Sequence, residues 1–158
     1  MDCSMRWSTL CELAQDRKIE GVTSDPQTVR DAFLITEPMD SLEVVLKKFL
    51  NLQKVLDSEE VLERLTYEVI EDAHSNNIKL IELRYSPSFV HAGREHLSYE
   101  KIHQAILRGA EKASNEFNVG YGLLGIIGRI DKRPIRNGVM DFIIENKITH
   151  QQAEELVK

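Results

Sequence analysis

The stretch IKLIELRYSP, residues 78–87, decides the fold of this chain. Ile81 and Leu83 fall on one face of an extended strand, Glu82 and Arg84 fall on the other, and the pattern ends at a proline. Two opposite charges on one face of a buried strand are costly unless they pair or form hydrogen bonds. We therefore expect Glu82 and Arg84 to form a pair inside a barrel with a polar mouth.

This strand lies between two strong helical patterns, over residues 58–76 and 98–116. The order helix–strand–helix is typical of a parallel α/β fold. A second strand is predicted within residues 119–130, where the core LLGII, residues 123–127, is apolar on both faces, as in a buried parallel sheet. Further helices are predicted at about 5–15, from 26 to about 33, at 41–55, at 135–146 and at 150–157.

Three polar residues are expected to cap helices. Ser4 precedes the first helix, and Asp25 stands before Pro26, a pair that is typical of a helix N-cap and its first residue. Asp57 precedes the long helical pattern that starts at residue 58. We therefore predict that Ser4, Asp25 and Asp57 are N-caps.

The segment IELRYSP, residues 81–87, resembles the second-strand signature of the adenosine deaminase family. Residues 2–6, DCSMR, are similar to the Leu-Asp-Gly-Ser-Met-Arg sequence that follows the family's first strand, with Cys3 in place of the glycine. The resemblance covers about residues 2–129 and implies a TIM barrel, which typically needs about 250 residues. We expect an α/β fold, a partial TIM (β/α) barrel formed by an N-terminal segment with additional helices, in a single domain over residues 1–158.

The resemblance implies zinc-dependent hydrolytic deamination of adenosine or deoxyadenosine, in which the metal lowers the pKa of its bound water. The family takes its zinc ligands from a His-x-His pair, a later histidine and a late aspartate, and this sequence matches none of these motifs. No catalytic residue and no metal ligand is therefore predicted, and we expect the chain not to catalyse deamination alone. The alternatives are a non-catalytic nucleoside-binding or interaction fragment and, less favoured, another purine or AMP deaminase relative.

The five histidines also lack the i, i+4 spacing of ligands on one helix face. They are His74, His91, His96, His103 and His150. We expect them to be solvated or hydrogen-bonded at the surface.

The resemblance does imply substrate contacts for some residues of this chain. Asp2 corresponds to the family's aspartate near the ribose, and its alternative is a solvated terminal residue. Gly128 corresponds to the end of the family's third strand, where glycine permits close approach of a ligand or only tight packing.

Four apolar residues on the helix at 41–55 match the helix that forms the apolar wall of the family's nucleoside pocket. They are Leu42, Val45, Leu46 and Phe49. The alternative interpretation is ordinary amphipathic packing of this helix.

The net charge is −6 with mixed signs, which argues against a nucleic-acid or anionic-membrane partner. No apolar run reaches the length of a membrane span, and the amino end shows no signal peptide. The two cysteines have neither metal-binding nor redox spacing, so a cytoplasmic protein is expected.

The predicted partners are a purine nucleoside and either a second copy or a complementary chain. Two strands leave at least one open sheet edge, and neither lysine nor proline interrupts residues 123–127. We therefore expect self-association or docking onto another chain.

Overall fold

The computed structural model describes residues 4–128 and 132–146. The chain divides into an amino-terminal unit, residues 2–57, and a carboxyl-terminal unit, residues 58–158. The expectation of a single domain stays a prediction. Asp2, Arg129 and the helix expected at 150–157 lie outside the described residues.

Three helices that contact one another form the amino-terminal unit. They are α1 (Trp7–Asp16), α2 (Pro26–Phe33) and α3 (Leu42–Val55). The carboxylate of Asp25 caps α2 by accepting a hydrogen bond from the backbone N–H of Gln27 at 2.9 Å, with Pro26 as the first helical residue. This confirms the start of α2 that the sequence predicts.

Two other predicted caps are wrong. Arg6 rather than Ser4 is the N-cap of α1, and it makes no side-chain cap bond. Ser58 rather than Asp57 caps α4, because its hydroxyl accepts a hydrogen bond from the N–H of Val61 at 3.3 Å. The Asp57 carboxylate instead accepts two hydrogen bonds from the Arg17 guanidinium, each 3.0 Å long, so this ion pair uses the group that was expected to cap.

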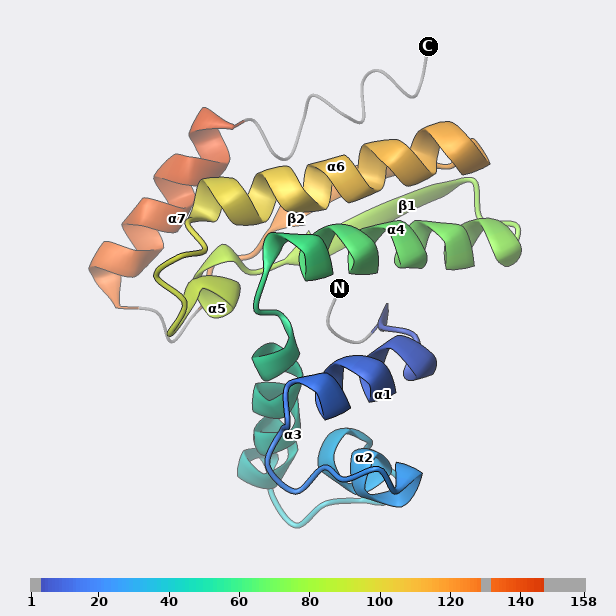
Figure 1. The fold of residues 1–158 in the computed structure, drawn as a ribbon. Coiled ribbons are helices and arrows are strands. Elements are labelled where there is room, and N and C mark those ends of the chain that lie inside the picture. Colours follow the sequence, from blue (N-terminus) through green and yellow to red (C-terminus); the bar gives the residue numbers. More distant parts are fainter. Residues whose placement is uncertain (1–3, 129–131, 147–158) are drawn as a thin grey trace. The chain divides into compact units, whose positions relative to one another are not determined.

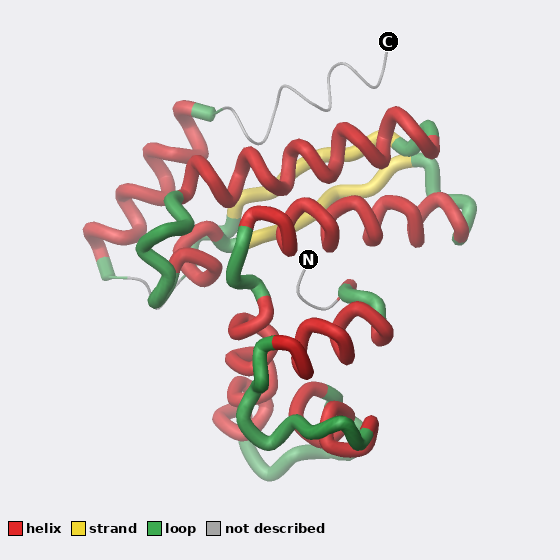
Figure 2. Tube along the Cα trace, in the orientation of Figure 1, coloured by secondary structure: helices red, strands yellow, loops and turns green. Residues whose placement is uncertain are grey.

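The carboxyl-terminal unit alternates helices and strands, as Figures 1 and 2 show. Its elements are α4 (Glu59–Ser75), β1 (Leu80–Tyr85), α5 (Pro87–His91), α6 (Tyr99–Phe117), β2 (Gly120–Gly125) and α7 (Arg133–Glu145). The two strands pair in parallel, from Leu80 opposite Gly120 to Tyr85 opposite Gly125. This arrangement confirms the α/β prediction with a parallel sheet and an α-helical crossover.

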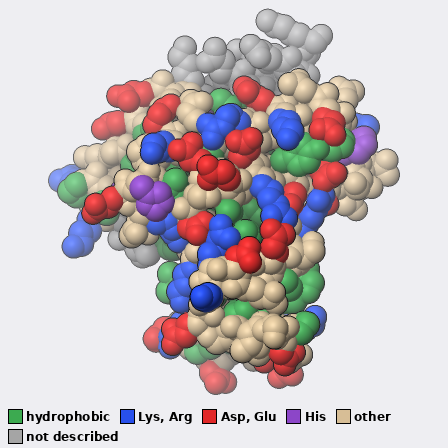
Figure 3. All heavy atoms as spheres, in the orientation of Figure 1, with side chains coloured by type: hydrophobic (Ala, Val, Ile, Leu, Met, Phe, Trp, Pro, Cys, Tyr) green, Lys and Arg blue, Asp and Glu red, His purple; other side chains and the backbone are tan. Residues whose placement is uncertain are grey.

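In Figure 1, α4 and α6 run side by side with the two strands behind them. The contact is close at Gly109, where a Cβ atom would lie 2.3 Å from the backbone oxygen of Glu63. Arg108 joins the same two helices, since its guanidinium donates to Glu63 at 2.9 Å and to Glu59 at 3.1 Å. Figure 3 shows charged side chains of both signs intermingled over these helices.

The two faces of β1 differ in burial. Leu83 and Tyr85 are buried, whereas Glu82 and Arg84 are exposed together with Leu80. The predicted burial of Glu82 and Arg84 is therefore wrong for this chain. The reason is that the sheet has two strands in the described structure, so their face is not enclosed as a closed barrel would enclose it.

The second strand is shorter than the sequence predicts. β2 ends at Gly125, and of the LLGII core only Leu123 is buried, while Ile127 is exposed. Among the described helices, none combines the length and the apolar character that crossing a membrane requires.

Candidate functional site

The RYSP signature places Tyr85 at the carboxyl end of β1, and Pro87 begins α5 immediately afterwards. The Tyr85 hydroxyl lies 2.9 Å from Nδ1 of His103 on α6, and both side chains are buried. The ring of Phe142 from α7 packs edge-on against His103, with centroids 5.8 Å apart. This strand end is therefore fixed by a buried polar contact inside an aromatic cluster.

Burial lowers the pKa of His103, and the negative charge of Glu100 opposes that shift. Burial likewise raises the pKa of Tyr85. Both effects keep the pair neutral, so the phenol and the imidazole share one hydrogen bond without carrying charge.

The expectation that His103 is a surface residue is wrong. A signal for its burial exists in the sequence, because His103 precedes Ile106 and Ala110 by three and seven residues, which is the spacing of the buried face of α6.

The remaining described histidines do not converge on a metal site. Nδ1 of His91 is 2.7 Å from the carbonyl oxygen of Leu97, and the ring of His74 stacks on Phe117. Within residues 4–128 and 132–146, no group of three or more His, Cys, Asp or Glu side chains is arranged to hold a metal ion. The described donor set therefore does not fit a zinc ion, which prefers four ligands, or three and a water.

The predicted nucleoside wall lies on α3. Leu42 and Leu46 are 71% and 49% exposed, and Val45 and Phe49 are half-buried. Spacings of three and four residues place these side chains on one helix face. The amino-terminal unit thus presents an apolar stripe that its own described residues leave largely open.

The other predicted contacts lie elsewhere in the chain. Gly128 follows β2 in the carboxyl-terminal unit and is half-buried, and Asp2 is outside the described residues. The assignment of substrate contacts to Asp2, Gly128 and the α3 residues stays a prediction.

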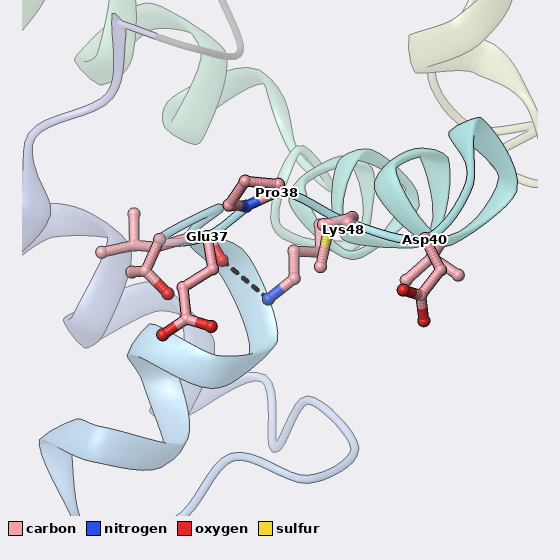
Figure 4. Close-up of a pocket in the computed structure, with 8 residues that line it drawn as sticks. Glu37, Pro38, Asp40 and Lys48 are labelled. Atoms are coloured by element: carbon pink, nitrogen blue, oxygen red, sulfur yellow. Dashed lines mark hydrogen bonds between the residues drawn. The ribbon is translucent and has the colours of Figure 1, made fainter.

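A polar hollow of about 280 Å³ lies between the loop after α2 and the side of α3 (Figure 4). Glu37 and Asp40 line it together with Lys48. The ammonium group of Lys48 donates hydrogen bonds to the carbonyl oxygens of Leu34 at 2.7 Å and Asp31 at 2.6 Å. Lys48 therefore holds the carboxyl end of α2 and is occupied by this structural contact.

An apolar hollow of about 420 Å³ lies between the three helices of the same unit. Leu10, Phe33 and Leu52 form a buried floor, and Trp7 lies at the exposed rim. Phe49 of the predicted nucleoside wall also lines this hollow. No local sequence pattern indicates this hollow, because the residues that form it come from helices that are distant in sequence.

Curated relatives of this chain include bacterial adenosine deaminases. The enzyme of Vibrio vulnificus is 28% identical over 137 residues, which are 86% of this chain and 41% of that protein. The enzyme of Shewanella woodyi is 28% identical over 142 residues, which are 89% of this chain and 42% of that protein. The chain thus spans about two fifths of the length of these relatives.

Two solved structures share the fold. An amidohydrolase from Burkholderia ambifaria with bound zinc matches 91% of this chain and 38% of its own, with a TM-score of 0.73 and 21% identity. An adenine deaminase from Arthrobacter aurescens matches 94% of this chain and 43% of its own, with a TM-score of 0.75 and 17% identity. At these identities the likeness shows the fold alone, which corresponds to part of a TIM barrel.

The family comparison covers nearly the whole chain. The model of the family described as adenosine deaminase matches residues 1–151, which include the RYSP strand end, α3 and every described helix and strand. This chain therefore belongs to the adenosine deaminase family.

Proposed function

We propose that this chain takes part in the zinc-dependent hydrolytic deamination of adenosine or deoxyadenosine by supplying one wall of the nucleoside pocket. The family match over residues 1–151 carries the proposal, and the open apolar stripe of α3 supports it. The bacterial enzymes that match this chain are named adenosine deaminases, which favours adenosine as the nucleoside.

The chemistry of the α3 stripe suits a purine ring. Leu42 and Leu46 are one helical turn apart and exposed, and the aromatic ring of Phe49 lies one turn further along the same face. Small-molecule pockets are lined mainly by apolar and aromatic side chains, with a few polar groups that set the orientation. A flat heteroaromatic base can therefore exchange water for contact with these three side chains.

In this proposal the described residues do not supply the catalytic groups. Attack of water on an adenine ring at neutral pH requires an activated nucleophile, which a bound metal supplies in this family. The described residues offer no group of three metal-binding side chains, so we derive no step through zinc from them. In this account zinc and its ligands come from outside the described residues or from another chain.

The second candidate is nucleoside binding or protein association without catalysis. The exposed face of β1, with Leu80, Glu82 and Arg84, favours it, because such a face gains stability when another surface covers it. The less favoured alternative, another purine or AMP deaminase relative, is tested by offering adenine and AMP beside adenosine.

Conversion of adenosine to inosine by the purified chain, with and without added zinc, tests the first candidate. We expect binding of adenosine without turnover. Zinc-dependent turnover that remains after repurification would show that the chain supplies catalytic groups in addition to one wall of the nucleoside pocket. The absence of both binding and turnover would leave association as the better account.

A further inference from the structure

The apolar hollow of the amino-terminal unit has the features of a binding site for a small molecule. Its floor is closed, since Leu10, Phe33 and Leu52 are at most 9% exposed. Its rim is open, because Trp7 is 37% exposed and Ile35 is 48% exposed. A volume of about 420 Å³ lies within the range of about 300–1,000 Å³ that is typical of ligand pockets.

The rim also carries a positive charge. The guanidinium carbon of Arg30, an exposed residue on α2, lies 5.9 Å from the centre of the Trp7 ring, at cation–π distance. Within the described part of the chain, no carboxylate forms an ion pair with Arg30. A planar guanidinium held over an aromatic ring at the edge of an apolar hollow can bind a carboxylate, sulfonate or phosphate through two parallel hydrogen bonds.

We infer that this hollow binds a small amphipathic anion, whose aromatic or branched apolar body rests on Leu10, Phe33 and Leu52 and whose charged group pairs with Arg30. The inference goes beyond the proposed deaminase role, because Leu42 and Leu46 do not line this hollow. Phe49 is the residue that the hollow shares with the predicted nucleoside wall.

Trp7 offers a direct test, since it is the only tryptophan in the chain and lies at the rim. The probe is 8-anilinonaphthalene-1-sulfonate, and its uncharged counterpart is N-phenyl-1-naphthylamine. We expect saturable quenching of Trp7 fluorescence by the sulfonate, with about tenfold weaker binding of the neutral compound. Arg30→Gln should remove this difference, whereas the same change at Arg136, an exposed arginine on α7, should preserve it.

Equal affinity for the two probes, or an unchanged preference in Arg30→Gln, would overturn the inference. Displacement of the sulfonate by adenosine would overturn it as well, because the hollow would then be the nucleoside site. That last result would leave the proposed function standing. Conversely, failure of the chain to bind adenosine would not alter the expected fluorescence titration.

Discussion

The hydroxyl of Tyr85 and Nδ1 of His103 lie 2.9 Å apart in the interior of the carboxyl-terminal unit. This contact ties the carboxyl end of β1 to the first turns of α6. In barrel enzymes the carboxyl ends of the strands carry the active site, and the contact fixes the backbone at the corresponding end of β1.

Stability should fall in acid because of His103. Burial lowers the pKa of this imidazole in the folded chain, so the unfolded chain binds the proton more tightly. The stabilising effect is complete above the unfolded pKa of about 6.5 and is lost as pH falls from that value to the lower folded pKa. Urea unfolding between pH 4.5 and 8 should show this loss in the wild type and in the exposed control His74→Gln, and a smaller loss in His103→Gln. The same pH dependence in all three proteins would contradict the assignment.

Replacement of Tyr85 by phenylalanine should destabilise the chain by about 1–3 kcal/mol, because Nδ1 of His103 loses its partner in the interior. Tyr67→Phe is the matched control. It removes an exposed hydrogen bond to Glu116, 2.8 Å long, and should cost clearly less. Equal losses of unfolding free energy in the two variants would show that the buried Tyr85–His103 hydrogen bond stabilises the chain no more than an exposed one.

Gly109→Ala should destabilise the packing of α4 on α6. The new Cβ would meet the backbone oxygen of Glu63 at 2.3 Å, so the helices must separate, at a cost of about 1–3 kcal/mol. In contrast, Gly138→Ala on α7 meets nothing within 4 Å and should stabilise the chain by up to about 1 kcal/mol. Thermal unfolding of the two variants should therefore shift in opposite directions, and a higher melting temperature for Gly109→Ala would contradict the close contact.

Lys48→Met should destabilise the amino-terminal unit by about 1–3 kcal/mol. The reason is that the carbonyl oxygens of Asp31, in α2, and of Leu34, directly after α2, lose a charged donor. Lys47→Met, an exposed neighbour on the same helix, should be nearly neutral. Hydrogen exchange of the α2 amides provides the local measurement. Unchanged protection of α2 in Lys48→Met would mean that this lysine does not hold the helix end.

Association of the chain is the expected consequence of its two-stranded sheet. In the described structure each strand pairs on one side only, and Leu80 on the open face is 60% exposed. Light scattering over a concentration series should show oligomers in the wild type and fewer in Leu80→Lys. A cooperative monomer at high micromolar concentration would count against this prediction.

Much of the secondary structure follows from local sequence. The pair Asp25–Pro26 predicts the start of α2, and the helical pattern over residues 98–116 predicts the start of α6, because both depend on residues that are near in sequence. The ion pair of Asp57 was not predictable in this way, since it joins this carboxylate to Arg17, forty residues away.

The same distinction holds for the candidate site. The spacing of the apolar residues of α3 is visible in the sequence, and so is the family resemblance of RYSP. The Tyr85–His103 bond and the rim formed by Arg30 and Trp7 depend on how separate elements pack. Burial of Glu82 and Arg84 was predicted from a closed barrel, and two strands do not enclose their face.

If α3 forms the nucleoside wall, the replacement Leu46→Gln should weaken the binding of adenosine. Leu46 is exposed, so its replacement should leave the fold intact, and Ile144→Gln, on an exposed position of α7, is the matched control. Calorimetry should show about tenfold weaker adenosine binding for Leu46→Gln and wild-type binding for Ile144→Gln. Wild-type affinity in Leu46→Gln, or an equal loss in both variants, would mean that α3 does not form the nucleoside wall.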